Sequence, residues 1–204
     1  MPGRGPSEGH SYPKGRRTRA EIVRAALEAF SAGGYRNASM VQIAAQCGVS
    51  RAGLAHHFPT KEALLAAVLQ ERDRADVEMF LDGADPSADG LDYLRRMLRV
   101  IEHNASTPGV VGLFATLSIE AADPNHPAHA YFAARYASLR RDLRLAFADL
   151  AARGMIRAGV DLTDLESDLI ALIDGLQIQW LLDPPGVDMA ARLRRRLTEI
   201  LGTI

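Results

Sequence analysis

Residues 39–61, with the sequence SMVQIAAQCGVSRAGLAHHFPTK, predict two short helices joined by a tight turn. Ser39 is a favourable N-cap, and Gln42 three residues later completes a capping box. Gly48 ends the first helix, where a residue with positive φ is often required. Ser50 can cap the second helix, which the following proline ends because the residue before a proline is displaced from the α region. Two short helices around a glycine-containing turn are typical of a helix-turn-helix.

Four runs in and just beyond this stretch resemble the TetR family of transcriptional regulators. In chain order they are Gln42-Ile43-Ala44, Gly48-Val49-Ser50, Gly53-Leu54 and residues 57–64. The resemblance is strongest over residues 18–65. It implies a three-helix DNA-binding head followed by a helical body that binds a ligand and dimerises.

Two further features bear on this resemblance. A late segment, residues 174–184, is also similar to the family. The chain departs from the family at Ala55, where many members carry a tyrosine that contacts a DNA phosphate. We therefore expect His56 or His57 to carry extra weight in that contact.

The composition favours a helical protein with a substantial core. Of the 204 residues, 48% are hydrophobic but only 6% are aromatic, and alanine and leucine abound. The single cysteine, Cys47, excludes an internal disulfide and predicts a cytoplasmic location. No apolar run approaches the roughly 18 residues that a membrane span needs, so we expect no membrane partner.

The charge is divided unequally along the chain. Residues 1–61 hold nine Lys or Arg against three Glu, a net charge of +6, whereas residues 62–204 hold fifteen Arg against twenty-two acidic residues, a net charge of −7. Such asymmetry indicates nucleic-acid binding. Chance asymmetry with a basic tail is the alternative, but the basic part contains the predicted helix-turn-helix.

Apolar periodicity and turn residues predict an all-α fold of about nine helices. Thr18 with Glu21, and Thr163 with Glu166, are expected to form two more capping boxes. The expected helices span approximately residues 18–32, 39–47, 50–58, 60–81, 91–104, 108–122, 128–153, 163–183 and 187–201.

This pattern divides the chain into three parts. Residues 1–15 are expected to form a disordered basic tail, residues 16–62 a helix-turn-helix DNA-binding domain, and residues 63–204 a ligand-binding and dimerisation domain. The tail and the arginines after it are as compatible with an arm that reaches DNA as with a solvated segment.

The predicted second helix of the helix-turn-helix supplies the candidates for reading bases. Its first turns carry Arg51, Ala52, Gly53 and His56. Arg51 is the strongest candidate because a guanidinium can pair bidentately with guanine, although a phosphate contact is an alternative role. The candidates for phosphate contacts are His57, Lys61, Ser39 and Gln42. The expected partner is a double-stranded DNA operator.

The helix predicted over residues 163–183 is apolar nearly all round, so it must be covered on several sides. A two-fold interface made by this helix and the last one would cover it, which agrees with the homodimer that the family resemblance implies. A core confined to one chain is the alternative. The interface candidates are Leu172, Leu176, Trp180, Leu193 and Leu197.

The middle helices supply candidates for a ligand pocket, because the corresponding region of the family encloses one. These candidates are Phe114, Leu117, Tyr136 and Gln177, and for each one plain core packing is the favoured alternative. No catalytic motif, cofactor site or cysteine pair is recognisable. His126 and His129 have a spacing compatible with a metal site, but their proline-rich surroundings favour a solvated turn.

The sequence therefore predicts a non-enzymatic, TetR-like DNA-binding regulator. It is expected to be a repressor that a small ligand releases from a palindromic operator, although activation is also compatible with the sequence. Two alternatives are an enzyme with a non-functional helix-turn-helix and a dimeric helical adaptor that no longer binds DNA. Salt-dependent DNA binding would distinguish the regulator hypothesis from both alternatives.

Overall fold

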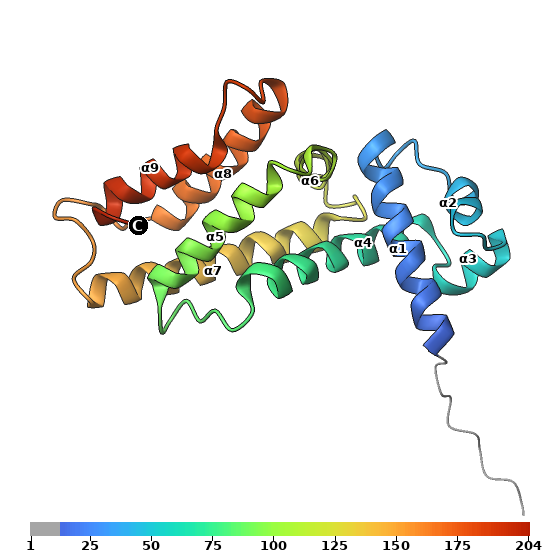
Figure 1. The fold of residues 1–204 in the computed structure, drawn as a ribbon, viewed down its shortest axis with the longest axis horizontal. Helices are drawn as coiled ribbons and strands as arrows, with labels where there is room; N and C mark the ends of the chain where they lie inside the picture. The colour runs from blue at the N-terminus through green and yellow to red at the C-terminus, as the bar shows by residue number, and fades with distance from the viewer. Residues whose placement is uncertain (1–12) are drawn as a thin grey trace, which may run out of the picture. The chain divides into compact units, whose positions relative to one another are not determined.

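The structure, a computed structural model, describes residues 13–204, which form nine α-helices and one π-helical turn without any strand (Figure 1). The all-α prediction is confirmed. The chain divides into two compact units between Val68 and Leu69. This boundary falls inside α4 (Lys61–Asp76), slightly beyond the predicted end of the head at residue 62. Most of the predicted tail, residues 1–12, lies outside the described residues.

The smaller unit consists of α1 (Pro13–Gly33), α2 (Met40–Gln46), α3 (Arg51–His57) and the beginning of α4. The predicted start of the first helix at Thr18 is wrong, because α1 begins at Pro13 and includes residues 13–15 of the predicted tail. Proline suits a first helical position, since its fixed φ is helical and its missing N–H has no intrahelical partner there.

A small apolar core holds the three helices of this unit together, with α2 packing against both α1 and α3. Phe30, Ile43, Leu54 and Phe58, which the sequence predicted to meet, are all at most 2% exposed. Tyr35 extends the core, with its ring edge-on to Phe30 at 5.4 Å between ring centres. This packing fixes the orientation of α3, because Leu54 within the helix and Phe58 directly after it are both buried in the core.

The two helices of the predicted helix-turn-helix are capped differently. Ser50 caps α3 as predicted, and its Oγ accepts a hydrogen bond of 3.0 Å from the Gly53 N–H. Gly48 has the predicted positive φ, at 64°. The capping box predicted for Ser39 and Gln42 is wrong, because the Ser39 side chain makes no capping hydrogen bond although it occupies the N-cap of α2.

The larger unit contains the remainder of the chain. After α4 and a π-helical turn at Val77–Leu81 come α5 (Gly90–Asn104), α6 (Pro108–Glu120), α7 (His129–Ala152), α8 (Leu165–Leu182) and α9 (Met189–Leu201). α5 packs against α7 and α9, and α8 packs against α6, α7 and α9. The single helix predicted over residues 60–81 therefore changes to the wider π-helical winding at Val77.

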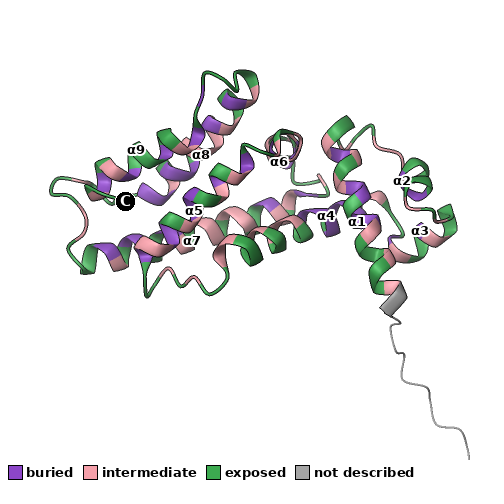
Figure 2. Cartoon of the chain, in the orientation of Figure 1, coloured by how far each residue is buried: buried purple, intermediate pink, exposed green. Residues whose placement is uncertain are grey.

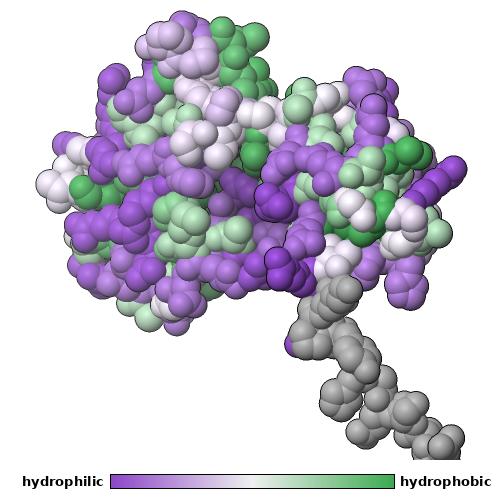
Figure 3. All heavy atoms as spheres, turned by 45° about the vertical axis from the view of Figure 1, so that its right-hand side comes forward, coloured by the Kyte–Doolittle hydropathy of each residue, from purple (hydrophilic) through white to green (hydrophobic). Residues whose placement is uncertain are grey.

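One apolar core joins α5, α7, α8 and α9 of the larger unit, with buried residues recurring along α5 and α8 (Figure 2). Leu94, Leu143, Leu150 and Leu193 are completely buried. Each such leucine contributes about 1.5–3 kcal/mol of hydrophobic stabilisation relative to an exposed one. Hydrophilic residues cover most of the molecular face seen in Figure 3, with hydrophobic residues in separate smaller patches.

The beginning of α8 differs from the capping box predicted for Thr163 and Glu166. Asp164 occupies the N-cap position with a positive φ of 54°, and its side chain makes no capping hydrogen bond. Glu166 is buried and instead accepts a hydrogen bond of 3.1 Å from Nε of Arg144 on α7. The glutamate therefore joins α8 to α7 and does not cap its own helix.

The crossing of α5 and α7 depends on Gly90. A Cβ atom at Gly90 would lie 2.3 Å from the carbonyl oxygen of Ala146, which is far inside van der Waals contact. The Gly90 N–H also donates a hydrogen bond of 2.9 Å to the Asp149 carboxylate. Only a residue without a side chain permits the first turn of α5 to approach the backbone of α7 this closely.

We predict that Gly90→Ala destabilises the protein by about 1–3 kcal/mol, because the added methyl group forces α5 away from α7. Gly112→Ala is the matched control, since a Cβ there meets Leu181 at an ordinary 3.7 Å. In the interior of α6 the control substitution should be neutral or stabilising by up to about 1 kcal/mol. Urea unfolding followed by circular dichroism measures both. Equal stability of the two variants would contradict this account of the crossing.

Candidate functional site

The first turns of α3 present the predicted base-reading residues to solvent. Arg51, Ala52 and His56 are exposed, and Gly53 is half-buried. Leu54, on the opposite side of the same helix, is 1% exposed and belongs to the core of the smaller unit. The structure therefore places the whole predicted set on one short helix that is anchored from behind.

Gly53 has a second role at this surface. Its N–H is held by the Ser50 side chain, and a Cβ at this position would lie 3.3 Å from the same Ser50 oxygen. A side chain at Gly53 would therefore crowd the cap that starts α3. Its absence also leaves the outer side of the helix open to close approach.

The predicted phosphate-contacting residues are distributed over three helices. Gln42 is exposed on α2, Ser39 is half-buried at the start of that helix, and His57 is half-buried at the end of α3. The His57 ring stands 5.5 Å from the His56 ring at an angle of 69°. The two histidines thus form one imidazole pair at the end of α3.

Lys61 is held against the turn that follows α1. Its Nζ donates a hydrogen bond of 3.0 Å to the Arg36 carbonyl oxygen and lies 4.8 Å from the centre of the Tyr35 ring. The Tyr35 hydroxyl donates to the Glu62 carboxylate at 3.3 Å, and burial together with Glu62 raises the pKa of Tyr35 to about 12. The lysine ammonium is therefore positioned by its neighbours, and it has further N–H groups that can donate hydrogen bonds.

The arginines that the sequence placed after the tail lie on the first turns of α1. Arg16, Arg17 and Arg19 are exposed, so this segment is helix and not an extended arm. The Arg19 guanidinium lies 4.9 Å from the centre of the Phe58 ring, and Arg17 pairs with Glu21 at 3.0 Å. These contacts fix two positive charges on the smaller unit.

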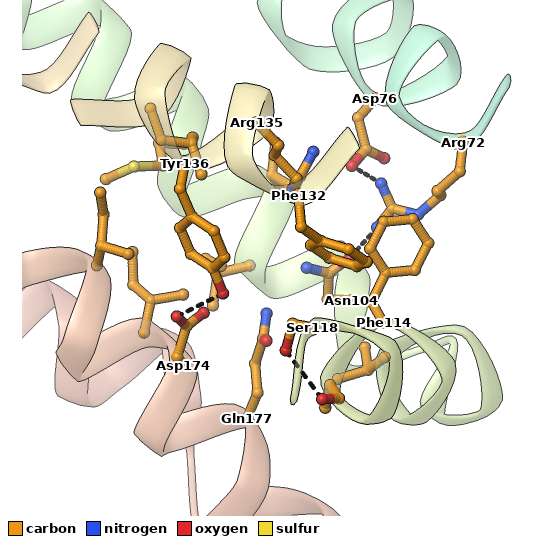
Figure 4. A pocket seen from close by; sticks show the side chains of 18 of the residues that line it. Arg72, Asp76, Asn104, Phe114, Ser118, Phe132, Arg135, Tyr136, Asp174 and Gln177 are labelled. Carbon is orange, nitrogen blue, oxygen red and sulfur yellow. Dashed lines mark hydrogen bonds and ion pairs between the residues drawn. The ribbon is translucent and has the colours of Figure 1, made fainter. Parts of the chain in front are cut away.

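The larger unit encloses a cavity of about 120 Å³. Its lining is mostly apolar and comes from α4, α5, α6, α7 and α8, as Figure 4 shows for many of its residues. The polar residues of the lining are Arg72, Asp76, Asn104, Ser118, Arg135, Tyr136, Asp174 and Gln177. A mostly apolar cavity with a few polar groups is typical of a small-molecule site.

Three of the four residues predicted for a ligand pocket line this cavity: Phe114, Tyr136 and Gln177. Leu117 does not line it, although it is buried to 1% exposure. On α6 Leu117 is three residues from Phe114 and seven from Val110, which both line the cavity, so helical spacing alone does not exclude it from the lining. The tertiary packing, and not the spacing along α6, decides which of its apolar residues line the cavity.

One part of the cavity wall is an ion-pair network that the sequence analysis missed. Arg72 pairs with Asp76, and its Nη2 donates a hydrogen bond of 2.7 Å to Oδ1 of Asn104. Arg135 pairs with Asp73, which also accepts a hydrogen bond of 2.6 Å from the Tyr131 hydroxyl. The latter contacts join residues about 60 positions apart in sequence, so no local pattern could reveal them.

Another part of the wall holds Asp174, whose carboxylate and the Tyr136 hydroxyl point toward each other in Figure 4. Tyr136 donates a hydrogen bond of 2.8 Å to Asp174. Burial raises the pKa of Asp174 above its usual value, although the Tyr136 hydrogen bond and the charge of Arg135 oppose this change. Burial and the same hydrogen bond raise the pKa of Tyr136 to about 12. An acidic residue in the middle of α8, beyond the acidic first turn and among apolar residues, was the signal that could have identified this site.

Four of the five predicted dimer-interface residues lie in the core of the chain itself. Leu176 and Trp180 are 3% and 6% exposed, and Leu193 and Leu197 are completely buried, so they offer almost no surface to a second copy. Only Leu172 is half-exposed. The assignment of the other four is corrected accordingly, since α9 covers one side of α8 within the chain.

A different face of α8 remains accessible. Ala171 is exposed, Ile178 is 44% exposed and Leu182 is 83% exposed. Gly175 lies between them at helical spacing, and a Cβ at this glycine would meet no atom within 4 Å. In the described range, residues 13–204, no helix is both long and apolar enough to cross a membrane.

Two family models match the chain. The model of the bacterial regulatory proteins of the tetR family matches residues 22–68, and the model of the C-terminal part of BetI-type transcriptional repressors matches residues 118–204. The chain belongs to the TetR family. The first match contains the helix-turn-helix described above, and the second contains α7, α8 and α9.

Two curated relatives are similar to parts of this TetR-family chain. The HTH-type transcriptional regulator UidR of Escherichia coli is 48% identical over 59 residues, which are 28% of this chain and 30% of UidR. The HTH-type transcriptional regulator RutR of Escherichia coli is 35% identical over 103 residues, which are 46% of this chain and 49% of RutR. The chain thus spans less than half the length of the curated relatives it matches.

Solved structures extend the similarity to nearly the whole chain. A TetR transcriptional regulator from Chloroflexus aurantiacus is 25% identical and superposes with a TM-score of 0.73. This match covers 93% of the present chain and 100% of that protein. The helical architecture of both units is therefore that of the family.

We predict that Asp174→Asn raises the thermal stability of the protein at pH 7, because it removes a half-buried negative charge. The folded-state pKa of Asp174 is raised, so the stability that protonation adds is fully present below the unfolded-state pKa and is lost as the pH rises through the folded-state value. The advantage of the variant should therefore shrink as the pH falls toward 4. Melting temperatures of both proteins across this pH range test the prediction. A variant that is less stable at pH 7, or a difference that is independent of pH, would contradict it.

Proposed function

We propose that this TetR-family protein is a DNA-binding transcriptional regulator, a repressor that leaves a palindromic operator when a small ligand binds. The observation that carries this proposal is the exposed row of Arg51, Ala52 and His56 on α3, anchored by a buried Leu54. It lies in the basic part of the chain, since residues 1–61 contain nine Lys or Arg but only three Glu. Positive charge around an exposed helix suits insertion into the major groove.

The side chains proposed to contact DNA divide by chemistry into two roles. Arg51 reads bases, because its guanidinium can donate two hydrogen bonds to the O6 and N7 atoms of guanine. Ala52 and Gly53 permit close approach of the helix to the base edges. Lys61 contacts a phosphate, since its ammonium is a positioned point charge at the start of α4 rather than on α3.

Ser39, Gln42 and the histidine pair complete the proposed DNA contacts. Ser39 and Gln42 come from the first turn of α2, and their hydroxyl and amide groups can donate to phosphate oxygens. His56 and His57 lie beside each other at the end of α3. They take the place of the tyrosine that many family members carry where this chain has Ala55.

The cavity of the larger unit is the proposed effector site. A ligand changes operator affinity only if it binds one conformation of the protein more tightly than another. α4 is the proposed link, because this one helix contains both Lys61 and the cavity residues Arg72 and Asp76. Any ligand that alters the Arg72–Asp76 pair would act directly on that helix.

We place the proposed dimer interface on the accessible face of α8. Ala171, Gly175, Ile178 and Leu182 follow one another at intervals of four, three and four residues, so they lie on one helix face. The two small residues permit close helix packing, and the two large apolar residues would lose their exposed surface. Leu172 flanks this face and is the one original interface candidate that remains available.

We predict distinct effects for two substitutions at the DNA surface. Arg51→Ala should cost about 1–3 kcal/mol per base contact and relax the base preference at one position of each half-site. Lys61→Ala should weaken binding to all sequences alike and reduce the slope of log affinity against log salt by about one unit per contact. An operator selected from random DNA, together with its single-base variants, is titrated across a salt series.

Two outcomes of this titration are informative, and one further variant serves as the control. The roles are reversed if Arg51→Ala lowers affinity uniformly while Lys61→Ala changes base preference. The adaptor and enzyme alternatives gain support if the wild-type protein shows no salt-dependent DNA binding. Arg95→Ala, an exposed substitution on α5, serves as the control that should leave both readouts unchanged.

We further predict that glutamate at two apolar positions gives different products. Ile178→Glu places a charge on the proposed interface, where the chain itself leaves the side chain 44% exposed, so it should yield folded monomers. Leu193→Glu buries an unpaired charge at a completely buried position and should unfold the larger unit. Sedimentation velocity and circular dichroism distinguish the products. A wild-type protein that sediments as a monomer at micromolar concentration would refute the dimer.

A further inference from the structure

The charges around the cavity are balanced unequally. Arg72 pairs with Asp76, and Arg135 pairs with Asp73. Both guanidinium groups thus already have carboxylate partners, and Asn104 accepts a further hydrogen bond from Arg72 at 2.7 Å. These groups leave little unsatisfied positive charge to attract an anionic ligand.

Asp174 is the carboxylate left over from this pairing. It is half-buried, lines the cavity, and accepts a hydrogen bond of 2.8 Å from the neutral Tyr136 hydroxyl. Within residues 13–204 it makes no ion pair. A carboxylate that is removed from water without a cationic partner is costly, so this part of the wall favours a positive charge from a ligand.

Aromatic rings near Asp174 add to this preference. Phe132 and Tyr136 lie one helical turn apart on α7, with ring centres separated by 6.5 Å and ring planes tilted by 34°. Both line the cavity, as does Phe114. The Cζ atoms of Arg72 and Arg135 lie 5.6 and 5.7 Å from the centre of the Phe114 ring. No cation of the described chain lies over the ring of Phe132 or Tyr136. Aromatic faces attract cations through the negative potential above the ring.

The volume of the cavity limits the size of the ligand. It is about 120 Å³, slightly less than the roughly 150 Å³ of an apolar cavity that holds benzene in another protein. A molecule of about six to eight non-hydrogen atoms therefore fits without a large rearrangement. Its apolar part would meet Met97, Ile101, Leu143 and Ile173.

We propose that the effector of this cavity is a small organic cation, whose ammonium group binds beside Asp174 and the rings of Phe132 and Tyr136. This inference rests on the proposed function only in treating the cavity as the effector site. The cation supplies Asp174 with the partner that the chain does not provide. Gln177, three residues from Asp174 on α8, is placed to accept or donate a hydrogen bond to a polar group of the same ligand.

Three probes of similar shape and different charge test the proposal directly. Cyclohexylammonium, cyclohexanol and cyclopentanecarboxylate, which have seven or eight non-hydrogen atoms each, are titrated into the 204-residue protein at pH 7 by isothermal calorimetry. We expect the cation to bind at least about tenfold more tightly than the neutral alcohol, and the carboxylate more weakly than either. Tighter binding of the alcohol or the carboxylate, or no detectable binding of the cation at millimolar concentration, would overturn the proposal.

Two matched variants locate the effect. Asp174→Asn keeps the shape of the side chain and an acceptor for Tyr136 but removes the charge, so it should abolish the preference for the cation by weakening cation binding at least about tenfold more than cyclohexanol binding. Asp168→Asn removes an exposed charge from the same helix and should retain the preference. Melting curves establish that both variants fold. If Asp174→Asn does not fold, the three probes on the wild-type protein still decide the sign of the ligand charge.

Operator binding is measured separately with the same probes. Release of the operator by cyclohexanol or cyclopentanecarboxylate, but not by the cation, would uphold the proposed regulator and refute the cationic effector. A protein that prefers the cation in calorimetry but binds no DNA would refute the proposed function and retain the site. The two failures are therefore distinguishable.

Discussion

The apolar circumference of α8 is the constraint on which the larger unit depends. A helix that is apolar nearly all round is stable in water only if other elements cover several of its sides. α6, α7 and α9 provide this cover, and α7 and α9 in turn pack against α5. This cover is incomplete in two places. Asp174 faces a cavity instead of a packed neighbour, and Ile178 and Leu182 stay exposed. The proposed ligand site and the proposed dimer interface both arise where the cover of α8 is incomplete.

The smaller unit solves the opposite problem, because it must hold one short helix with its polar side outward. α3 has only seven residues and would not be stable alone. Leu54 within it and Phe58 just after it are fixed in the core with Phe30 and Ile43, and Ser50 caps its first turn. Packing on one side of α3 thus determines which side chains face solvent on the other.

Local sequence predicted much of this arrangement and missed the rest for identifiable reasons. The surface of α3 was predictable because the apolar Leu54 and the polar Arg51 and His56 belong to the same short helix. The cavity was predictable only in part. Phe114 and Tyr136 were candidates because the family resemblance implied a pocket in the middle helices, but the Arg135–Asp73 ion pair joins α7 to α4 across 62 positions. Leu117 was assigned to the cavity because the corresponding region of the family encloses a pocket, and only the neighbouring helices decide which apolar residues of α6 line it.

By itself the sequence determined the helical class, the helix-turn-helix, the charge division and the apolar faces, because each depends on residue type and spacing along the chain. The tertiary structure alone decided what covers each face. Leu176, Trp180 and Leu193 had the apolar character of interface residues, and their burial within the chain follows from the packing of α8 on α9 and of α9 on α5. Helical periodicity identifies a face that must leave water, but a contact with the same chain and a contact with a second copy satisfy that requirement equally.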